Sequence, residues 1–170
     1  MKKILIFLGI FIFFTVPSFA EIGIGPKLVW PNANFDEHNY DFLLPGIDLL
    51  METRGPIGAL GLRIGYAKAE DDSGSNTKKM ELLDVVAYYR RYITKSVNLS
   101  VGVGVAYASF EYEEHGWFYH NYYDGNKFAP LLNVGLEWYI NKYLALSADY
   151  HYLNKDDISE YASFSLRLYF

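Results

Sequence analysis

Cysteine is absent from this chain of 170 residues. Its absence excludes disulfide bonds, thiol nucleophiles, cysteine-ligated zinc and a lipid anchor on an N-terminal cysteine. Excess positive charge is missing as well, because 20 acidic residues stand against 15 basic ones. An acidic chain is a poor ligand for nucleic acid, so no such partner is expected. The residues present in quantity are tyrosine and glycine, which favour a single domain of pleated β-structure.

A long apolar run is also missing beyond residue 20. Two lysines, an apolar run over 4–16 and small residues before position 21 predict a secretory signal peptide at 1–20. An uncleaved membrane anchor is the alternative for the same segment. The mature domain is then 21–170, which has no run able to cross a bilayer as a helix. If this domain spans a membrane, it must do so as a closed β-barrel.

Apolar and polar residues alternate with a period of two in eight segments. In the clearest, 98–108, Val101, Val103 and Val105 share one face, and mostly small residues occupy the other. Each segment is long enough to cross the thin core of an outer membrane as a tilted strand. The segments are 22–30, 45–52, 59–66, 83–90, 98–108, 132–138, 144–152 and 161–170.

The connections between these segments alternate in length. Tight connections are predicted at 53–56, 93–96 and 140–142, and longer polar ones at 31–42, 68–79, 111–126 and 153–159. This alternation, with both termini on the tight-turn side, is typical of outer-membrane barrels. The sequence predicts an all-β fold, an eight-stranded antiparallel up-and-down transmembrane β-barrel. In such a barrel, the long connections are expected to face outward from the cell and the tight turns to face the periplasm.

The polar faces of the strands indicate which side is inside. A soluble periplasmic lipocalin-like binding protein, the alternative, would show the same period but a highly charged outer face. Here the polar faces hold mostly glycine, alanine and serine, which suits the inside of a narrow tube. The few charges are nearly balanced in sign and are expected to plug the lumen as a network, leaving no large pore. The predicted network is Lys27, Asp48, Glu52, Arg63, Asp84, Arg90, Glu137, Asp149, His151 and Arg167.

The end of the chain carries a more specific pattern. Phe164, Leu166, Leu168 and the terminal Phe170 alternate with Ser165, Arg167 and Tyr169. With the strand before it, this segment resembles the OmpA/OmpX-like outer-membrane β-barrel family. The resemblance implies a monomer in the outer membrane of a Gram-negative cell, surrounded by lipid and lipopolysaccharide. It also implies that the barrel-assembly machinery recognises the C-terminal strand through these four apolar residues.

Catalytic and cofactor-binding residues are harder to identify in this sequence. Small barrels that resemble this one include a lipid A deacylase, which uses a His-x-Ser pair on a late strand. A lipid A-modifying enzyme is therefore the first alternative function. Here His151 is followed at that spacing by Leu153, so the nucleophile is missing and no catalytic residue is expected. No cofactor is predicted, and His115, His120 and Asp124 lack a distinctive metal-ligand spacing.

The segment 111–126 is unusually rich in rings for an exposed loop. Tyrosine and tryptophan provide a large contact area at low conformational-entropy cost, which favours a contact surface. The predicted surface residues are Tyr112, Trp117, Phe118, Tyr119, Tyr122 and Tyr123. The sequence therefore predicts a structural or surface-interaction role rather than catalysis.

Overall fold

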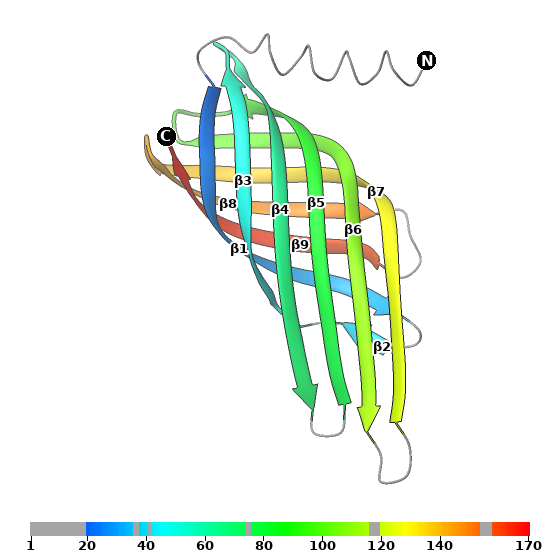
Figure 1. Cartoon of the computed structure of the whole chain (residues 1–170). Coiled ribbons are helices and arrows are strands. Elements are labelled where there is room, and N and C mark those ends of the chain that lie inside the picture. Colours follow the sequence, from blue (N-terminus) through cyan, green and yellow to red (C-terminus); the bar gives the residue numbers. More distant parts are fainter. Residues whose placement is uncertain (1–19, 36–37, 41, 74–75, 116–119, 154–157) are drawn as a thin grey trace, which may run out of the picture.

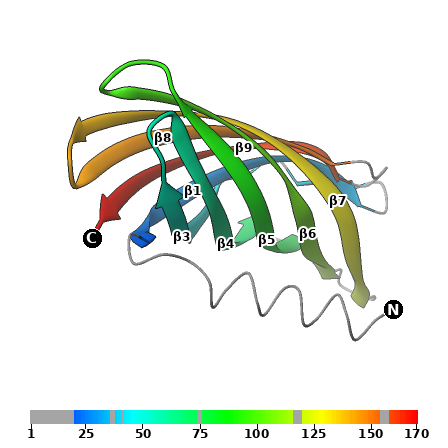
Figure 2. The same ribbon diagram turned by 90° about the horizontal axis from the view of Figure 1, so that it is seen from above.

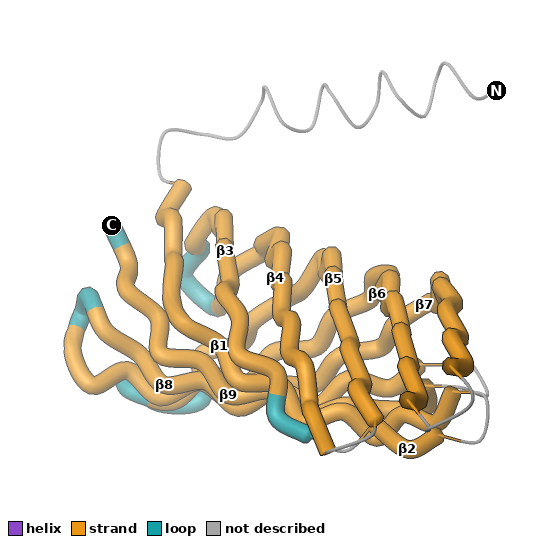
Figure 3. Tube along the Cα trace, turned by 60° about the horizontal axis from the view of Figure 1, so that its bottom comes forward, coloured by secondary structure: helices purple, strands orange, loops and turns teal. Residues whose placement is uncertain are grey.

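The structure is a computed structural model that describes residues 20–35, 38–40, 42–73, 76–115, 120–153 and 158–170. The predicted signal peptide lies outside these residues except for Ala20. Figure 3 shows that the described part is almost entirely strand, joined by short turns. No described helix is long and apolar enough to cross a membrane. The strands are β1 Ala20–Phe35, β2 His38–Tyr40, β3 Leu44–Arg54, β4 Gly58–Ser73, β5 Asn76–Tyr92, β6 Val97–His115, β7 His120–Asn141, β8 Leu144–Leu153 and β9 Ile158–Tyr169.

These strands form one antiparallel sheet that closes on itself. The order is β2-β1-β3-β4-β5-β6-β7-β8-β9, and an additional β1–β9 pairing closes the ring. The short strand β2 pairs only with the end of β1 and adds nothing to the wall. The predicted eight-stranded barrel is confirmed. Figure 1 shows the front wall of β3–β6 crossing the back wall of β8, β9 and β1 at a steep angle, as expected for tilted strands.

The closing seam between β1 and β9 is irregular at two places, a register shift between Asn32 and Ala33 and a gap nearer the tight turns. Its ladder pairs Ile24 with Leu168, skips two residues of β1, and resumes at Lys27 with Ser165. One skipped residue is Pro26, which has no N–H to donate. The other is Gly25, where an added Cβ would lie 1.7 Å from the Leu166 carbonyl oxygen, so only glycine fits this close approach.

Side chains alternate strictly between the two faces of the wall. In β8 and β9, buried and exposed residues alternate almost without a break. Val103 is 61% exposed and Leu132 57%, whereas the lumen-facing Asp48 and Asp84 are fully buried. An apolar exterior around a charged interior is the reverse of a water-soluble barrel, so the lipocalin-like alternative is wrong.

The strands differ greatly in length, which corrects part of the sequence analysis. Most of the segments predicted as long loops at 68–79 and 111–126 are strand, because β4 continues to Ser73 and β6 to His115. Four strands, β4 to β7, therefore run beyond the rest of the wall as an extended sheet (Figure 1). Figure 2 shows the curvature of this wall from above. We call the end with the tight turns and Phe170 the turn end, and the opposite end the extended end.

Candidate functional site: the barrel interior and the extended sheet

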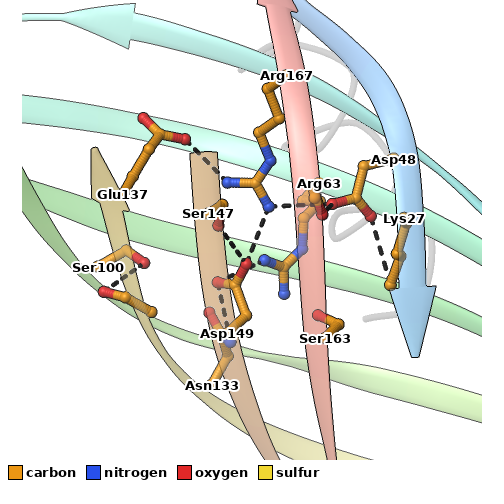
Figure 4. A network of polar contacts seen from close by, with 12 residues as sticks. Lys27, Asp48, Arg63, Ser100, Asn133, Glu137, Ser147, Asp149, Ser163 and Arg167 are labelled. Carbon is orange, nitrogen blue, oxygen red and sulfur yellow. Dashed lines mark hydrogen bonds and ion pairs between the residues drawn. The ribbon is translucent and has the colours of Figure 1, made fainter. Parts of the chain in front are cut away.

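A layer of ion pairs crosses the middle of the lumen. Lys27 Nζ of β1 lies 2.6 Å from Asp84 Oδ2 of β5 and 3.3 Å from Asp48 Oδ1 of β3. On β4, Arg63 Nη1 lies 2.8 Å from Asp149 Oδ1 of β8. All five side chains are buried. Arg63 Nε also lies 3.9 Å from Asp84 Oδ1, so five strands around the wall are connected through their charges. Figure 4 shows the part of this layer that contains Lys27, Asp48 and Asp149.

Arg167 of β9 is the hub of this layer. Its Nη2 lies 3.0 Å from Asp48 Oδ2 and 3.0 Å from Asp149 Oδ2, and its Nη1 lies 2.9 Å from Glu137 Oε2. Figure 4 shows the guanidinium pointing toward all three carboxylates. A planar guanidinium with several donors suits this role, because an ammonium group offers no such fork.

A second polar layer lies closer to the turn end. Arg90 Nη1 lies 2.7 Å from Glu52 Oε2 and 3.0 Å from Glu137 Oε1, and the Tyr88 hydroxyl donates to Glu52 at 2.9 Å. Arg54 also reaches Glu52 at 3.0 Å and donates to the Tyr139 hydroxyl at 2.7 Å. Arg54 is not among the lumen residues predicted from the sequence, because the segment 53–56 reads as a turn. Its position on the lumen face of β3, two residues after Glu52, could have revealed it.

Glycine makes room for the central charges. At Gly65, an added Cβ would lie 2.2 Å from Lys27 Nζ and 2.7 Å from Asp84 Oδ2. A side chain there would occupy the space in which this ion pair forms. The frequent glycines on the polar faces thus follow from a lumen only wide enough for interlocking side chains.

His151 has a neighbour that the sequence did not reveal. Pairing of β8 with β9 places Ser163 Oγ 3.2 Å from His151 Nε2, and Asp149 lies on the same face of β8. The residue types resemble a nucleophile, a base and an orienting acid. However, His151 is fully buried, stacks on Tyr161 at 4.0 Å between ring centroids and also contacts Arg63 at 3.3 Å. Ser163 is only 1% exposed, so no substrate carbonyl reaches its hydroxyl.

Beyond the charges, toward the extended end, the lumen is apolar. Leu82, Met80, Phe110 and Leu131 are buried there in one cluster. Tyr40 of β2 joins them: its ring lies 5.1 Å from the Phe110 ring, and its hydroxyl donates to the Glu111 carbonyl at 3.2 Å. Because β1 and β6 are four strands apart in a ring of eight, β2 carries Tyr40 across the lumen. This apolar layer is not predicted from the sequence, although Tyr40 and Phe42 are conspicuous rings in a polar segment.

The ring-rich segment is only partly the predicted contact surface. Tyr112 is buried on the inner face of β6, 6.1 Å from the Tyr123 ring, so its assignment to an exposed loop is wrong. Tyr122 and Tyr123 are exposed, but they belong to strand β7. Trp117, Phe118 and Tyr119 lie outside the described residues.

The extended sheet is acidic. Lys68 pairs with Glu81, and Lys79 lies 3.8 Å from Glu70 and 4.0 Å from Glu111. Other acids on these strands form no ion pair with a described residue; they include Asp71, Asp72, Glu113 and Asp124. Partial burial, reinforced by the carboxylates of Glu111 and Asp124, raises the pKa of the Tyr122 phenol above its usual value. Within the described part of the chain, no three His, Asp or Glu side chains gather as a metal site.

An apolar belt around a closed, charge-filled tube of eight strands defines a small outer-membrane β-barrel. The sequence agrees: residues 7–169 match the family model described as outer membrane protein beta-barrel domain, and the chain belongs to that family. None of the curated proteins compared with the chain matches it.

Solved structures support the same fold. The chain is similar to Ail, the attachment invasion locus protein of Yersinia pestis, with a TM-score of 0.69 at 16% identity over 89% of this chain and 97% of that one. It is also similar to the N-terminal β-barrel domain of Pseudomonas aeruginosa OprF, with a TM-score of 0.56 at 14% identity over 88% of this chain and 97% of that one. A third similar structure is neisserial surface protein A, with a TM-score of 0.54 at 11% identity over 89% of this chain and 96% of that one. Ail has also been solved in complex with the heparin analogue sucrose octasulfate. At these identities the likeness establishes the fold alone.

Proposed function

We propose that this barrel is a non-catalytic surface protein whose extended sheet faces away from the cell. It binds an extended, cationic polypeptide segment by strand addition to β7. The observation that carries the proposal is the free edge of that strand. The apolar belt is surrounded by outer-membrane lipid and lipopolysaccharide, and the barrel acts as a monomer.

The free edge of β7 is long. Its ladder with β8 begins only at the pair Leu131–Leu153, so among the described residues the backbone of 120–130 pairs with β6 and with no other strand. Exposed rings line this edge: Tyr122 is 50% exposed and Phe128 62%. Unpaired N–H and C=O groups beside exposed rings form a template for another strand.

The edge of β4 on the other side of the sheet differs. Beyond its last pair with β3, Gly46–Ala67, it carries Lys68, Glu70, Asp71 and Asp72. Closely spaced charges are a common device that blocks strand addition. This contrast singles out β7 as the binding edge.

The sign of the charge indicates the partner. The acids around β7, including Asp124, Glu111 and Glu113, favour a cationic segment. A sulfated polyanion such as the heparin analogue bound by Ail would be repelled by them.

The non-catalytic role is supported by the burial of the His151 and Ser163 pair, which leaves no room for a substrate. A lipid A-modifying activity would require a nucleophile on the lipid-facing surface. Lipid A mass spectra from cells with and without the protein should therefore have the same acyl pattern.

Strand addition is tested at Asn126. The Tyr139 N–H donates to the carbonyl of Ser96, the residue directly before β6. The register between β6 and β7 is continuous from there, so odd-numbered residues of β7 bond to β6. The N–H of Asn126 therefore points to the free edge. The backbone nitrogen of Pro130 lies on the same edge, so a proline already occurs at an equivalent position of this strand. Asn126→Pro removes one edge donor without breaking the pairing with β6. We expect it to weaken binding of a peptide of alternating lysine and valine by about tenfold.

Surface plasmon resonance on barrels in nanodiscs measures this binding. The Tyr107 hydroxyl donates to the Asn126 side chain at 2.8 Å, and both Asn126→Pro and Asn126→Ala lose this contact. The matched control, Asn126→Ala, keeps the backbone N–H, so it should bind the peptide as the wild type does. Equal affinity for a peptide with glutamate in place of lysine, or no effect of Asn126→Pro, would contradict the proposal.

The lumen is proposed to be closed, because two layers of ion pairs and an apolar layer fill it in series. Reconstitution into planar bilayers should leave the current at the level of a protein-free membrane. A porin measured in the same bilayers serves as the positive control. Large, steady ohmic steps from the barrel would show that these layers do not seal it.

A further inference from the structure

A cavity lies at the turn end, opposite to the extended sheet. It has a volume of about 660 Å³ and opens between the β5–β6 turn and the β7–β8 turn. The two turns are adjacent, since the Tyr139 N–H donates to the Ser96 carbonyl at 2.8 Å. Its lining includes Arg54, Lys95, Asn98, Tyr139 and Lys142.

Positive charge dominates this end of the barrel. The three tight turns at 55–57, 93–96 and 141–143 contain two lysines and no acidic residue. Neither Lys95 nor Lys142 has an ion pair among the described residues, and Lys142 Nζ lies 4.5 Å from the centre of the Tyr143 ring. Glu21, an acid at the rim, is paired with Arg54. Two free ammonium groups thus face a common opening.

The turns that carry these lysines are held in shape. Thr94 Oγ1 accepts hydrogen bonds from the backbone N–H groups of Ser96 and Val97 at 3.2 and 2.9 Å. Asn141 Oδ1 accepts one from the Tyr143 N–H at 2.8 Å. Such side-chain bonds fix tight turns, so each lysine projects from a defined backbone position.

A largely buried amide lines the same cavity. Asn98 is only 4% exposed, and its side chain makes no hydrogen bond with any described residue, but its amide keeps access to the cavity. A polar group at the base of an opening that has no protein partner is available to water or to a ligand. An amide donor beside two ammonium groups suits a phosphate oxygen.

The outer lip of the cavity is apolar. Ile93 and Ile140 line it and are 55% and 50% exposed, and Ile140 follows Trp138 on the outward face of β7. With the orientation proposed above, this lip lies in the periplasmic leaflet of the outer membrane. A ligand with a phosphate at one end and hydrocarbon at the other matches both parts of the lining.

We propose that this cavity binds the headgroup of an anionic glycerophospholipid, with the phosphate between Lys95, Lys142 and Asn98 and the acyl chains against Ile93 and Ile140. The site would anchor the turn end in the periplasmic leaflet. It is independent of the strand-addition site, because the two lie at opposite ends of the barrel.

Native mass spectrometry of the detergent-purified barrel tests the site, with phosphatidylglycerol as the probe and phosphatidylcholine for comparison. The wild type should retain phosphatidylglycerol preferentially. In Lys95→Gln with Lys142→Gln, the affinity should fall about thirtyfold. Asn98→Leu should lower it about tenfold while leaving the stability of the barrel unchanged, since the amide has no protein partner to lose. The matched control, Lys68→Gln with Lys79→Gln, removes two lysines from the extended sheet and should bind as the wild type does.

Retention that does not change in the double lysine variant would overturn the proposal. Tight binding of inorganic phosphate, equal to that of the lipid, would assign the site to free phosphate and overturn the lipid. Preferential binding of a peptidoglycan fragment would likewise overturn it. Because the assay is done in detergent, its result does not depend on the peptide experiment or on which end faces the cell exterior.

Discussion

Arg167→Met should destabilise the barrel by about 3 to 5 kcal/mol, because it removes one partner of a buried ion network. Three carboxylates, those of Asp48, Glu137 and Asp149, lie within 3.0 Å of its guanidinium. Each keeps one other cation: Lys27, Arg90 or Arg63. The barrel should therefore still close, but unfold at a lower urea concentration in lipid vesicles, as followed by tryptophan fluorescence.

The control for this prediction is the same substitution at an exposed site. Arg91 neighbours Arg90 on the outward face of β5 and has no ion pair among the described residues. Arg91→Met should change the free energy of unfolding by no more than about 0.5 kcal/mol. If both variants unfolded at the wild-type urea concentration, Arg167 would not be the hub that its contacts indicate. Adding Glu137→Gln to Arg167→Met should recover part of the loss, because it removes one of the carboxylates left behind.

Phe170→Ala should strongly reduce the amount of folded barrel in the outer membrane of living cells. We propose that the ring of Phe170, with Phe164, Leu166 and Leu168, is the signal that the barrel-assembly machinery recognises. The ring is 76% exposed and so contributes little packing, whereas the backbone of Phe170 donates to the Ile22 carbonyl at 2.9 Å. Substitution by alanine keeps this backbone pairing and removes only the ring. The measurement is the fraction of heat-modifiable protein in isolated outer membranes.

A refolding experiment separates assembly from stability. Purified Phe170→Ala should refold into lipid vesicles with the yield and urea midpoint of the wild type, because its contacts in the seam are intact. A second variant, Ile57→Ala, removes another highly exposed side chain at the turn end and should assemble normally in cells. Equal loss of folded protein in vesicles and in cells would mean that Phe170 stabilises the barrel rather than directing its assembly.

Much of the wall could be predicted from the sequence, because alternation is a local property of each strand. Val101, Val103 and Val105 point outward simply because side chains alternate along a β-strand. The same rule places Lys27, Asp84 and Arg167 inside. The ends of the strands are harder to predict from the sequence. Polar residues such as Glu70 and Glu111 read as loop, but the paired neighbours of β4 and β6 hold them in strands.

The sequence by itself determined that eight strands alternate, that the small and charged face is the inside, and that ten named ionisable residues share it. Only the tertiary structure decided which of these meet. Strand tilt and stagger bring Arg167 to three carboxylates from three strands, carry Tyr40 across the lumen to Phe110, and place Ser163 beside His151. The physical reason is that alternation is a property of one strand, whereas pairing across a lumen depends on the relative stagger of strands far apart in the chain. The free edge of β7 and the unpartnered amide of Asn98 likewise became visible only once the neighbouring strands were in place.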